Sequence, residues 1–205
     1  MTYEKPVLNI AIAGLGVVGS EVARQLTSRN DALSAAGGTR LQLVAVSARS
    51  KANDRGFSMD GIQWVDDARD LAKIDDVDVV IELIGGSEGV ALDLTRDALR
   101  ATKHVITANK AMLAEHGHPL ALSAEAAGRV IRYEAAVAGG IPVIKSLTEG
   151  LAGNEIQRVL GVMNGSCNYI LTRMEDAGLT YEEVFAEADG LGYLEADPNL
   201  DVGGI

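Results

Sequence analysis

The chain has 205 residues, of which 47% are hydrophobic, and a formal net charge of -11 at pH 7. This composition is typical of a globular chain with a core and argues against intrinsic disorder. The negative charge argues against nucleic-acid and anionic-membrane partners, because both favour clustered Lys and Arg. Cys167 is the only cysteine, which excludes an intrachain disulfide and a cysteine-based zinc site. No apolar run spans a bilayer and the first residues do not resemble a signal peptide, so we expect a cytoplasmic protein.

Strands are expected to alternate with helices along residues 1–150. The predicted strands are apolar and partly β-branched, and they cover residues 7–13, 41–47, 77–83, 104–110 and 130–137. The helical patterns between them cover residues 18–29, 66–72, 87–102 and 119–128. This alternation is typical of right-handed βαβ crossovers, so the sequence predicts a doubly wound, mainly parallel α/β sheet.

The pattern changes beyond Gly150. Residues 156–163 predict a strand and residues 166–177 predict a helix. Thr180 and Glu183 have the spacing of a capping box, which predicts the start of a further helix. We therefore expect residues 151–205 to begin an α+β domain, and because the chain stops in a loop we interpret it as truncated.

A glycine-rich turn follows the first predicted strand and opens the first predicted helix. In a GxGxxG turn the first Gly allows the tight turn and the second lets a phosphate approach the backbone. The third lets the helix pack closely against the strand. The pattern predicts a dinucleotide site of the Rossmann type, and a plain glycine-rich turn is the alternative. The residues of the turn are Gly14, Leu15, Gly16, Val17, Val18 and Gly19.

The end of the second predicted strand indicates which dinucleotide would bind. NAD sites usually place an Asp or Glu there to accept a hydrogen bond from the ribose 2′-hydroxyl. This chain instead has Arg49 and Lys51 beside small hydroxyl side chains, and no acid. The two cations suit a 2′-phosphate and favour NADP over NAD. The alternative is a solvated basic loop in which Arg49 stacks over the adenine.

Two further residues follow strand ends at the edge where open α/β sheets bind ligands. Lys110, next to Asn109, suits a contact with the nicotinamide ribose or with a substrate carboxylate, and an ordinary surface lysine is the alternative. Glu82 lies at the end of an apolar run. It is either a functionally tuned carboxylate or an acceptor of backbone hydrogen bonds at the strand end.

Residues 134–142, EAAVAGGIP, combine a predicted strand end with two glycines and a proline. Carbonyl groups turned outward by such a loop suit a hard monovalent cation, and a simple strand-to-helix turn is the alternative. Glu195 and Asp197 would either bind an amino group or form part of a solvated acidic face. The three histidines have no metal-ligand spacing and are interpreted as structural: His104, His116 and His118.

Taken together, these motifs resemble those of homoserine dehydrogenase. TANK followed by EAAVAGGIP and NGSCNYIL is far more specific than the glycine pattern alone. The matching segments run in order over almost the whole chain: GLGVVGSEV, DVVIELIGG, VITANKAMLAEHG, YEAAVAGGIPVIKSL, GVMNGSCNYILTRM and ADGLGYLEADPNLDVGG.

The resemblance implies NAD(P)-dependent interconversion of L-homoserine and L-aspartate 4-semialdehyde, on the route to threonine, methionine and isoleucine. Hydride transfer would occur at the nicotinamide C4, with the cofactor on residues 14–19. Ile84, Gly85, Lys110 and Gly192 would also contact the cofactor. Lys110 would touch the reacting centre as well, and Glu195 would bind the amino group of homoserine. The implied sodium ligands, largely carbonyls, are Glu134, Val137, Gly139 and Ile141.

The chain departs from the family pattern at its end. The family continues with an Asp that binds substrate and, four residues further, a Lys proposed as the general acid/base, whereas this chain stops at Ile205. We expect a weakly active or inactive fragment, because losing a general acid costs about 10²–10⁴ in rate. The family forms homodimers through the missing part and acts on a small molecule.

Two alternative functions remain open. One is a non-catalytic NADP-binding module, such as a redox sensor. The other is a different Rossmann reductase that acts on another semialdehyde. In such an enzyme Cys167, at a predicted helix start, would be a nucleophile, whereas otherwise it is a small packing residue.

Overall fold

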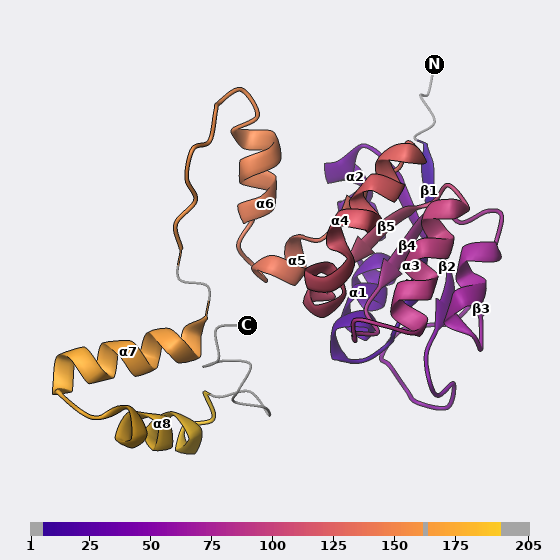
Figure 1. Ribbon diagram of the computed structural model, residues 1–205. Helices are drawn as coiled ribbons and strands as arrows, with labels where there is room; N and C mark the ends of the chain where they lie inside the picture. The colour runs from indigo at the N-terminus through magenta and orange to yellow at the C-terminus, as the bar shows by residue number, and fades with distance from the viewer. Residues whose placement is uncertain (1–5, 162–163, 194–205) are drawn as a thin grey trace. The chain divides into compact units, whose positions relative to one another are not determined.

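The computed structural model describes residues 6–161 and 164–193 (Figure 1). The chain divides into two compact units, an N-terminal unit of Met1–Ala152 and a C-terminal unit of Gly153–Ile205. Within the described ranges, no helix combines the length and the apolar character that crossing a bilayer requires.

The N-terminal unit is built on a six-stranded parallel sheet with the strand order β3-β2-β1-β4-β5-β6. This order confirms the doubly wound, Rossmann-type fold, and its switch point lies between β1 and β4. The strands are β1 (Val7–Ala13), β2 (Arg40–Ser47), β3 (Gln63–Trp64), β4 (Val79–Glu82), β5 (His104–Thr107) and β6 (Ile131–Arg132).

Helices connect these strands and continue beyond β6 (Figure 1). Those between the strands are α1 (Val17–Ser28), α2 (Asn30–Gly37), the 3-10 helix η1 (Ala68–Lys73), α3 (Val90–Arg100) and α4 (Lys110–Ala126). Those after β6 are α5 (Glu134–Val137), α6 (Val143–Lys145) and the π-helical turn η2 (Ser146–Gly150).

The side chains of β1 alternate between two hydrophobic cores. Ile10 and Ile12 belong to a core that includes Leu26 of α1. Ala11 belongs to a second core that includes Leu94 of α3. Because successive strand residues point to opposite faces, the two cores lie on the two faces of the sheet. Burial on both faces explains why the central strands read as continuous apolar runs rather than as alternating ones.

Three sequence-based predictions for the N-terminal unit are wrong in extent. The helix predicted at 119–128 begins at Lys110, because the Asn109 side chain accepts a hydrogen bond from the Met112 N–H at 3.1 Å and caps it. The fourth predicted strand therefore ends at Thr107. Of the strand predicted at 130–137, only Ile131–Arg132 pairs with β5, and the residues from Glu134 turn into a short helix. The patterns also missed α2 and β3.

The C-terminal unit contains a pair of packed helices. They are α7 (Gly165–Ala177) and α8 (Tyr181–Gly190), with Ile170, Val184 and Ala188 buried between them. The capping box predicted at Thr180 is present at the start of α8. The predicted strand at 156–163 is wrong over its described residues 156–161, which form no strand. A strand needs a neighbour for its backbone groups, and no described segment pairs with this one.

Gly19 provides a test of how tightly α1 packs on the sheet. A Cβ at this position would lie 1.8 Å from the carbonyl oxygen of Gly14. We expect Gly19→Ala to lower the free energy of unfolding by about 3 kcal/mol, as overpacking does, measured by chemical denaturation. Gly16→Ala is the matched control, because a Cβ at Gly16 meets no atom within 4 Å. Equal stability of the two variants would contradict this packing.

Candidate dinucleotide site

The glycine turn connects the ends of three strands at the switch point. Gly14, with a φ of 95°, donates its N–H to the Ser47 carbonyl at the end of β2, at 2.8 Å. A Cβ at Gly14 would lie 2.4 Å from the carbonyl oxygen of Leu83, just after β4. Only glycine fits this position, because both its φ and its surroundings exclude a side chain.

The N-terminus of α1 faces open space beside this turn. Gly16 is the N-cap residue and has no side chain to occupy the first N–H groups of the helix. Val17 and Val18, which follow it, are exposed, and the first turn contains no acidic residue. N–H groups that have no helical partner, at the positive end of the helix dipole, form a site suited to phosphate.

A cleft of about 910 Å³ extends from the glycine turn across the ends of β2 and β4. Of the residues predicted to contact the cofactor, five line this cleft: Gly14, Leu15, Gly16, Arg49 and Ile84. Lys51 instead lines a neighbouring hollow of about 410 Å³ that shares Asn53 and Arg55 with the cleft. The sequence patterns missed several polar side chains of the cleft: Asn53, Arg55, Asp67 and Arg69.

Arg55 ties the loop after β2 to the glycine turn. Its guanidinium donates to the carbonyls of Ser50 and of Asn53, the latter at 2.9 Å, and its Nε lies 3.4 Å from the carbonyl oxygen of Leu15. The guanidinium also lies over the Trp64 ring, 5.4 Å from its centroid. In the sequence, the one indication of this role was that Arg55 is a third cation close to Arg49 and Lys51. The contact between Arg55 and Leu15 joins residues 40 apart, so a local pattern does not reveal it.

The cleft is also lined by an Asp–Arg pair. The Asp67 side chain caps η1, and its Oδ2 lies 2.6 Å from Nη2 of Arg69. Hydrogen bonds from the Arg69 side chain and backbone lower the pKa of Asp67 to about 2. Asp67 is thus ionised and paired at neutral pH, which reduces its repulsion of an anionic ligand.

The structure supports the interpretation of Glu82 as an acceptor of hydrogen bonds at the strand end. Its side chain is fully buried, and Oε1 accepts hydrogen bonds from the N–H groups of Ile84 at 2.7 Å and Gly85 at 3.1 Å. Its Oε2 accepts from the Thr107 hydroxyl at 2.5 Å. The hydroxyl oxygen of Thr107 in turn accepts from the Asn109 N–H at 3.0 Å. Glu82 is therefore an acceptor of hydrogen bonds at the strand end and joins β4 to β5.

Lys110 is the first residue of α4 and is exposed, next to the buried Asn109. The Asn109 amide also donates to the Gly86 carbonyl at 2.7 Å, so the start of α4 and the loop after β4 are joined. Lys110 is thereby placed at the carboxyl edge of the sheet, with its side chain forming no hydrogen bond or ion pair to the described residues.

The segment predicted to bind a cation forms a compact turn. The carboxylate of Glu134 accepts from the N–H groups of Ile144 and Lys145, both at 2.9 Å, at the start of α6. The carbonyls of Glu134 and Ile141 each accept one backbone hydrogen bond, at 3.2 Å and 2.8 Å. A carbonyl oxygen has two lone pairs, so both carbonyls retain capacity for a cation.

The structure describes only some of the predicted site residues of the C-terminal unit. Gly192 is exposed, with a φ of 72°. Cys167 lies in the first turn of α7, where its N–H donates to the Asn164 side chain at 2.9 Å. Glu195 and Asp197 lie outside the described residues.

The sheet order, the glycine turn and the open helix N-terminus define a dinucleotide-binding protein of the Rossmann class. A family model described as the NAD binding domain of homoserine dehydrogenase matches residues 14–134, and one described as homoserine dehydrogenase matches residues 142–205. The chain belongs to the homoserine dehydrogenase family.

Known family members are similar over nearly the whole chain. Homoserine dehydrogenases of Neisseria gonorrhoeae and Mycobacterium tuberculosis (strain H37Rv) are 41% and 44% identical over 98% of it. The crystal structure of a homoserine dehydrogenase from Thiobacillus denitrificans has a TM-score of 0.81, with 35% identity over 97% of this chain and 46% of that one.

A hyperthermophilic archaeal homoserine dehydrogenase in complex with NADPH has a TM-score of 0.76 and 26% identity. That match covers 97% of this chain and 65% of the archaeal one. The Neisseria and Mycobacterium matches cover 45% of each relative, so the chain spans about half the length of these curated relatives.

Removing the buried carboxylate of Glu82 provides a further test of the site. Glu82→Ala leaves the N–H groups of Ile84 and Gly85 and the Thr107 hydroxyl without their acceptor. We expect the free energy of unfolding to fall by about 2–3 kcal/mol, measured by chemical denaturation. The control is Glu125→Ala on the exposed face of α4, which should change stability by less than about 0.5 kcal/mol. Similar losses in both variants would rule out the stabilising role of Glu82.

Proposed function

We propose that this chain supplies the NADP-binding half and part of the substrate-binding half of a homoserine dehydrogenase. Residues 1–150 form the NAD(P)-binding domain, and residues 151–205 begin the substrate and dimerisation domain. The reaction is the interconversion of L-homoserine and L-aspartate 4-semialdehyde, in threonine, methionine and isoleucine biosynthesis. The observation that carries the proposal is the unobstructed N-terminus of α1 beside Gly14 and Gly16, at the switch point of the sheet.

The residues of the cleft suit the two phosphate-bearing parts of NADP. The first N–H groups of α1 hold the pyrophosphate, since Gly16 leaves room for it. Arg49 and Lys51 bind the 2′-phosphate, while Arg55 keeps their loop in place through its backbone contacts. When bound, the cofactor supplies the hydride donor or acceptor at its nicotinamide C4.

The nicotinamide end of the cofactor belongs at the edge formed by β4 and β5. Ile84 and Gly85 follow β4 and Lys110 opens α4, and the family resemblance adds Gly192 as a further cofactor contact. In this arrangement Lys110 touches cofactor and reacting centre, and Glu195 binds the amino group of the substrate. The support is that Glu82 and Asn109 fix the backbone on either side of this edge.

A sodium-like monovalent cation fits the turn that follows β6. Its ligands are mainly the carbonyl oxygens of Glu134, Val137, Gly139 and Ile141, a donor set of the hard kind that such an ion prefers. The Glu134 carboxylate is already bonded to the start of α6, so it orders the turn and leaves ligation to the carbonyls.

The whole protein is proposed to act in the cytoplasm as a homodimer or higher homo-oligomer. Its substrates are small amino acids, and the acidic net charge disfavours a nucleic-acid partner. The family membership favours this function over a sensor module or a different semialdehyde reductase.

Cofactor binding is tested by fluorescence. Trp64 is the only tryptophan and lines the hollow next to the cleft, so NADPH bound in the cleft should quench its emission saturably. Gly16→Ala should weaken NADPH binding by at least about tenfold, because its methyl group would occupy the place of the pyrophosphate. Gly37→Ala in α2 is the control, since its Cβ also meets no atom within 4 Å.

A wild-type chain that shows no saturable quenching would refute the proposal. The reaction itself is tested by homoserine-dependent reduction of NADP in the protein that contains this chain, with serine as the control substrate.

The preference for NADP provides a separate prediction. Arg49→Ala and Lys51→Ala should each raise the Kd for NADPH about tenfold and the Kd for NADH less than about twofold, because only NADPH carries the 2′-phosphate. Arg100→Ala at the end of α3 is the control and should change neither value. Equal weakening of both cofactors by Arg49→Ala would instead indicate stacking on the adenine.

A further inference from the structure

The loop between β4 and α3, residues 83–89, is rich in glycine and lies at the edge of the cleft. Gly85, Gly86 and Gly89 all have positive φ values, of 85°, 86° and 70°. None of the three has a neighbouring atom within 4 Å of an ideal Cβ. Glycines in open space lose much conformational entropy on folding, so a single loop geometry requires specific contacts.

Three contacts hold this β4–α3 loop along its length. Glu82 accepts from the N–H groups at its start, as described above. The Asn109 amide donates to the Gly86 carbonyl at 2.7 Å in the middle. Near its end, Oε1 of Glu88 lies 2.7 Å from Nε2 of His116. These last two contacts come from the N-cap residue of α4 and from α4 itself.

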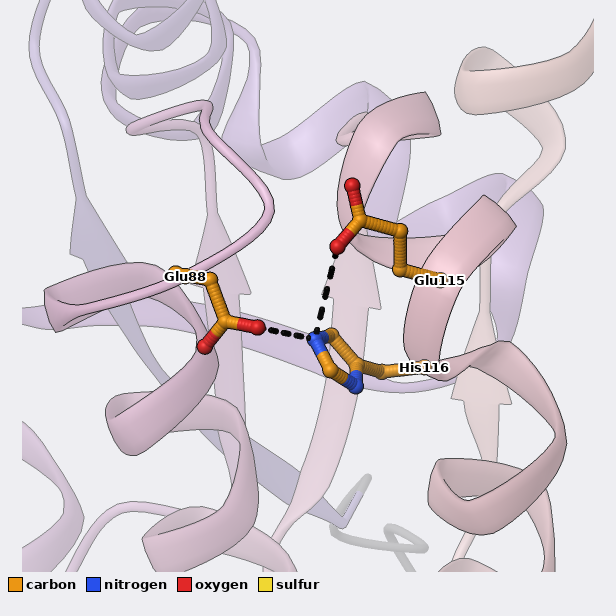
Figure 2. A group of neighbouring side chains, drawn as sticks. All are labelled: Glu88, Glu115 and His116. Atoms are coloured by element: carbon orange, nitrogen blue, oxygen red, sulfur yellow. Dashed lines mark hydrogen bonds and ion pairs between the residues drawn. The ribbon is translucent and has the colours of Figure 1, made fainter. Parts of the chain in front are cut away.

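Figure 2 shows how the Glu88–His116 contact is made: Glu88 reaches from the segment before α3 toward the imidazole of His116 on α4. A carboxylate can only accept, so Nε2 carries the hydrogen and donates it. The His116 side chain is 19% exposed and that of Glu88 is 66% exposed. The Glu115 carboxylate lies 3.9 Å from the same nitrogen, beyond hydrogen-bond distance.

The end of the loop determines part of the wall of the cleft. Ile84 inside the loop and Val90 immediately after it both line the cleft. Glu88 is two residues before Val90, so its bond to His116 fixes the backbone that delivers Val90 to this wall. The same helix α4 begins at Lys110, so the bond connects this loop to the helix that carries Lys110.

We propose that the Glu88–His116 hydrogen bond positions the β4–α3 loop for binding of the nicotinamide cofactor. His116 and Glu88 are positioning residues, which act through the loop rather than by touching the cofactor. This inference rests on the proposed function. Its physical basis is that a loop already held in its binding conformation loses less entropy when the ligand binds.

The first measurement is the Kd for NADPH in four variants of the chain. Glu88→Ala and His116→Ala should each raise it about fivefold, as loss of one partly exposed charged hydrogen bond does. The double variant should be no weaker than the single ones, because both remove the same bond. Glu115→Ala is the matched control, since it removes the same charge beside the same imidazole without removing a hydrogen bond.

Rescue separates positioning from a general loss of stability. His116→Gln places an amide N–H near the position of Nε2 and should restore most of the affinity that His116→Ala loses. Hydrogen exchange of a peptide covering residues 83–90, measured without cofactor, should accelerate in Glu88→Ala and stay unchanged in Glu115→Ala. Exchange in α1 should not change in either variant.

The outcomes distinguish this inference from the proposed function. If the wild-type chain does not bind NADPH, the proposed function fails, while the exchange of the loop still tests the hydrogen bond. If Glu88→Ala changes neither loop exchange nor Kd relative to Glu115→Ala, the inference is overturned. It is also overturned if EDTA alone releases the loop, because the three side chains of Figure 2 would then hold a metal ion.

Discussion

The whole site depends on the close approach of two backbones at Gly14. A Cβ there would lie 2.4 Å from the Leu83 carbonyl, and one at Gly19 would lie 1.8 Å from the Gly14 carbonyl. Without side chains at these positions, β1 ends directly against β4 and α1 starts directly above the turn. The cleft exists because these three elements meet at one point, and the first N–H groups of α1 open toward it.

The charges that line the cleft, rather than the net charge of the chain, determine whether it can bind an anionic ligand. The chain carries a net charge of -11, yet the cleft gathers Arg49, Arg55 and Arg69. Asp66 and Asp67 also line it, but the Asp66 carboxylate accepts a hydrogen bond from the Trp64 indole at 2.8 Å, and Arg69 pairs with Asp67 and lowers its pKa to about 2. An acidic protein can thus present an anion site, because at distances beyond about 10 Å the surrounding charges are largely screened.

Helix α4 organises the other side of the sheet edge. Its N-cap residue Asn109 bonds the loop after β4, its first residue is Lys110, and His116 bonds Glu88 further along the same loop. A glycine-rich loop and a lysine that are distant in sequence therefore share one rigid support. Such support from regular structure is what a binding site needs for a defined geometry.

Local sequence patterns determined β1, the glycine turn, α1 and the capping box of α8, because each depends on residues close in the chain. They also placed Glu82 at the end of β4, whereas Lys110, predicted at the end of a strand, is the first residue of α4. Tertiary structure decided the rest. The strand predicted at 156–163 does not form over residues 156–161, since a strand needs a partner elsewhere. The roles of three further side chains also depend on contacts with residues distant in the sequence, which no local pattern encodes. These are the contacts of Arg55 with Leu15, of His116 with Glu88 and of Glu82 with Thr107.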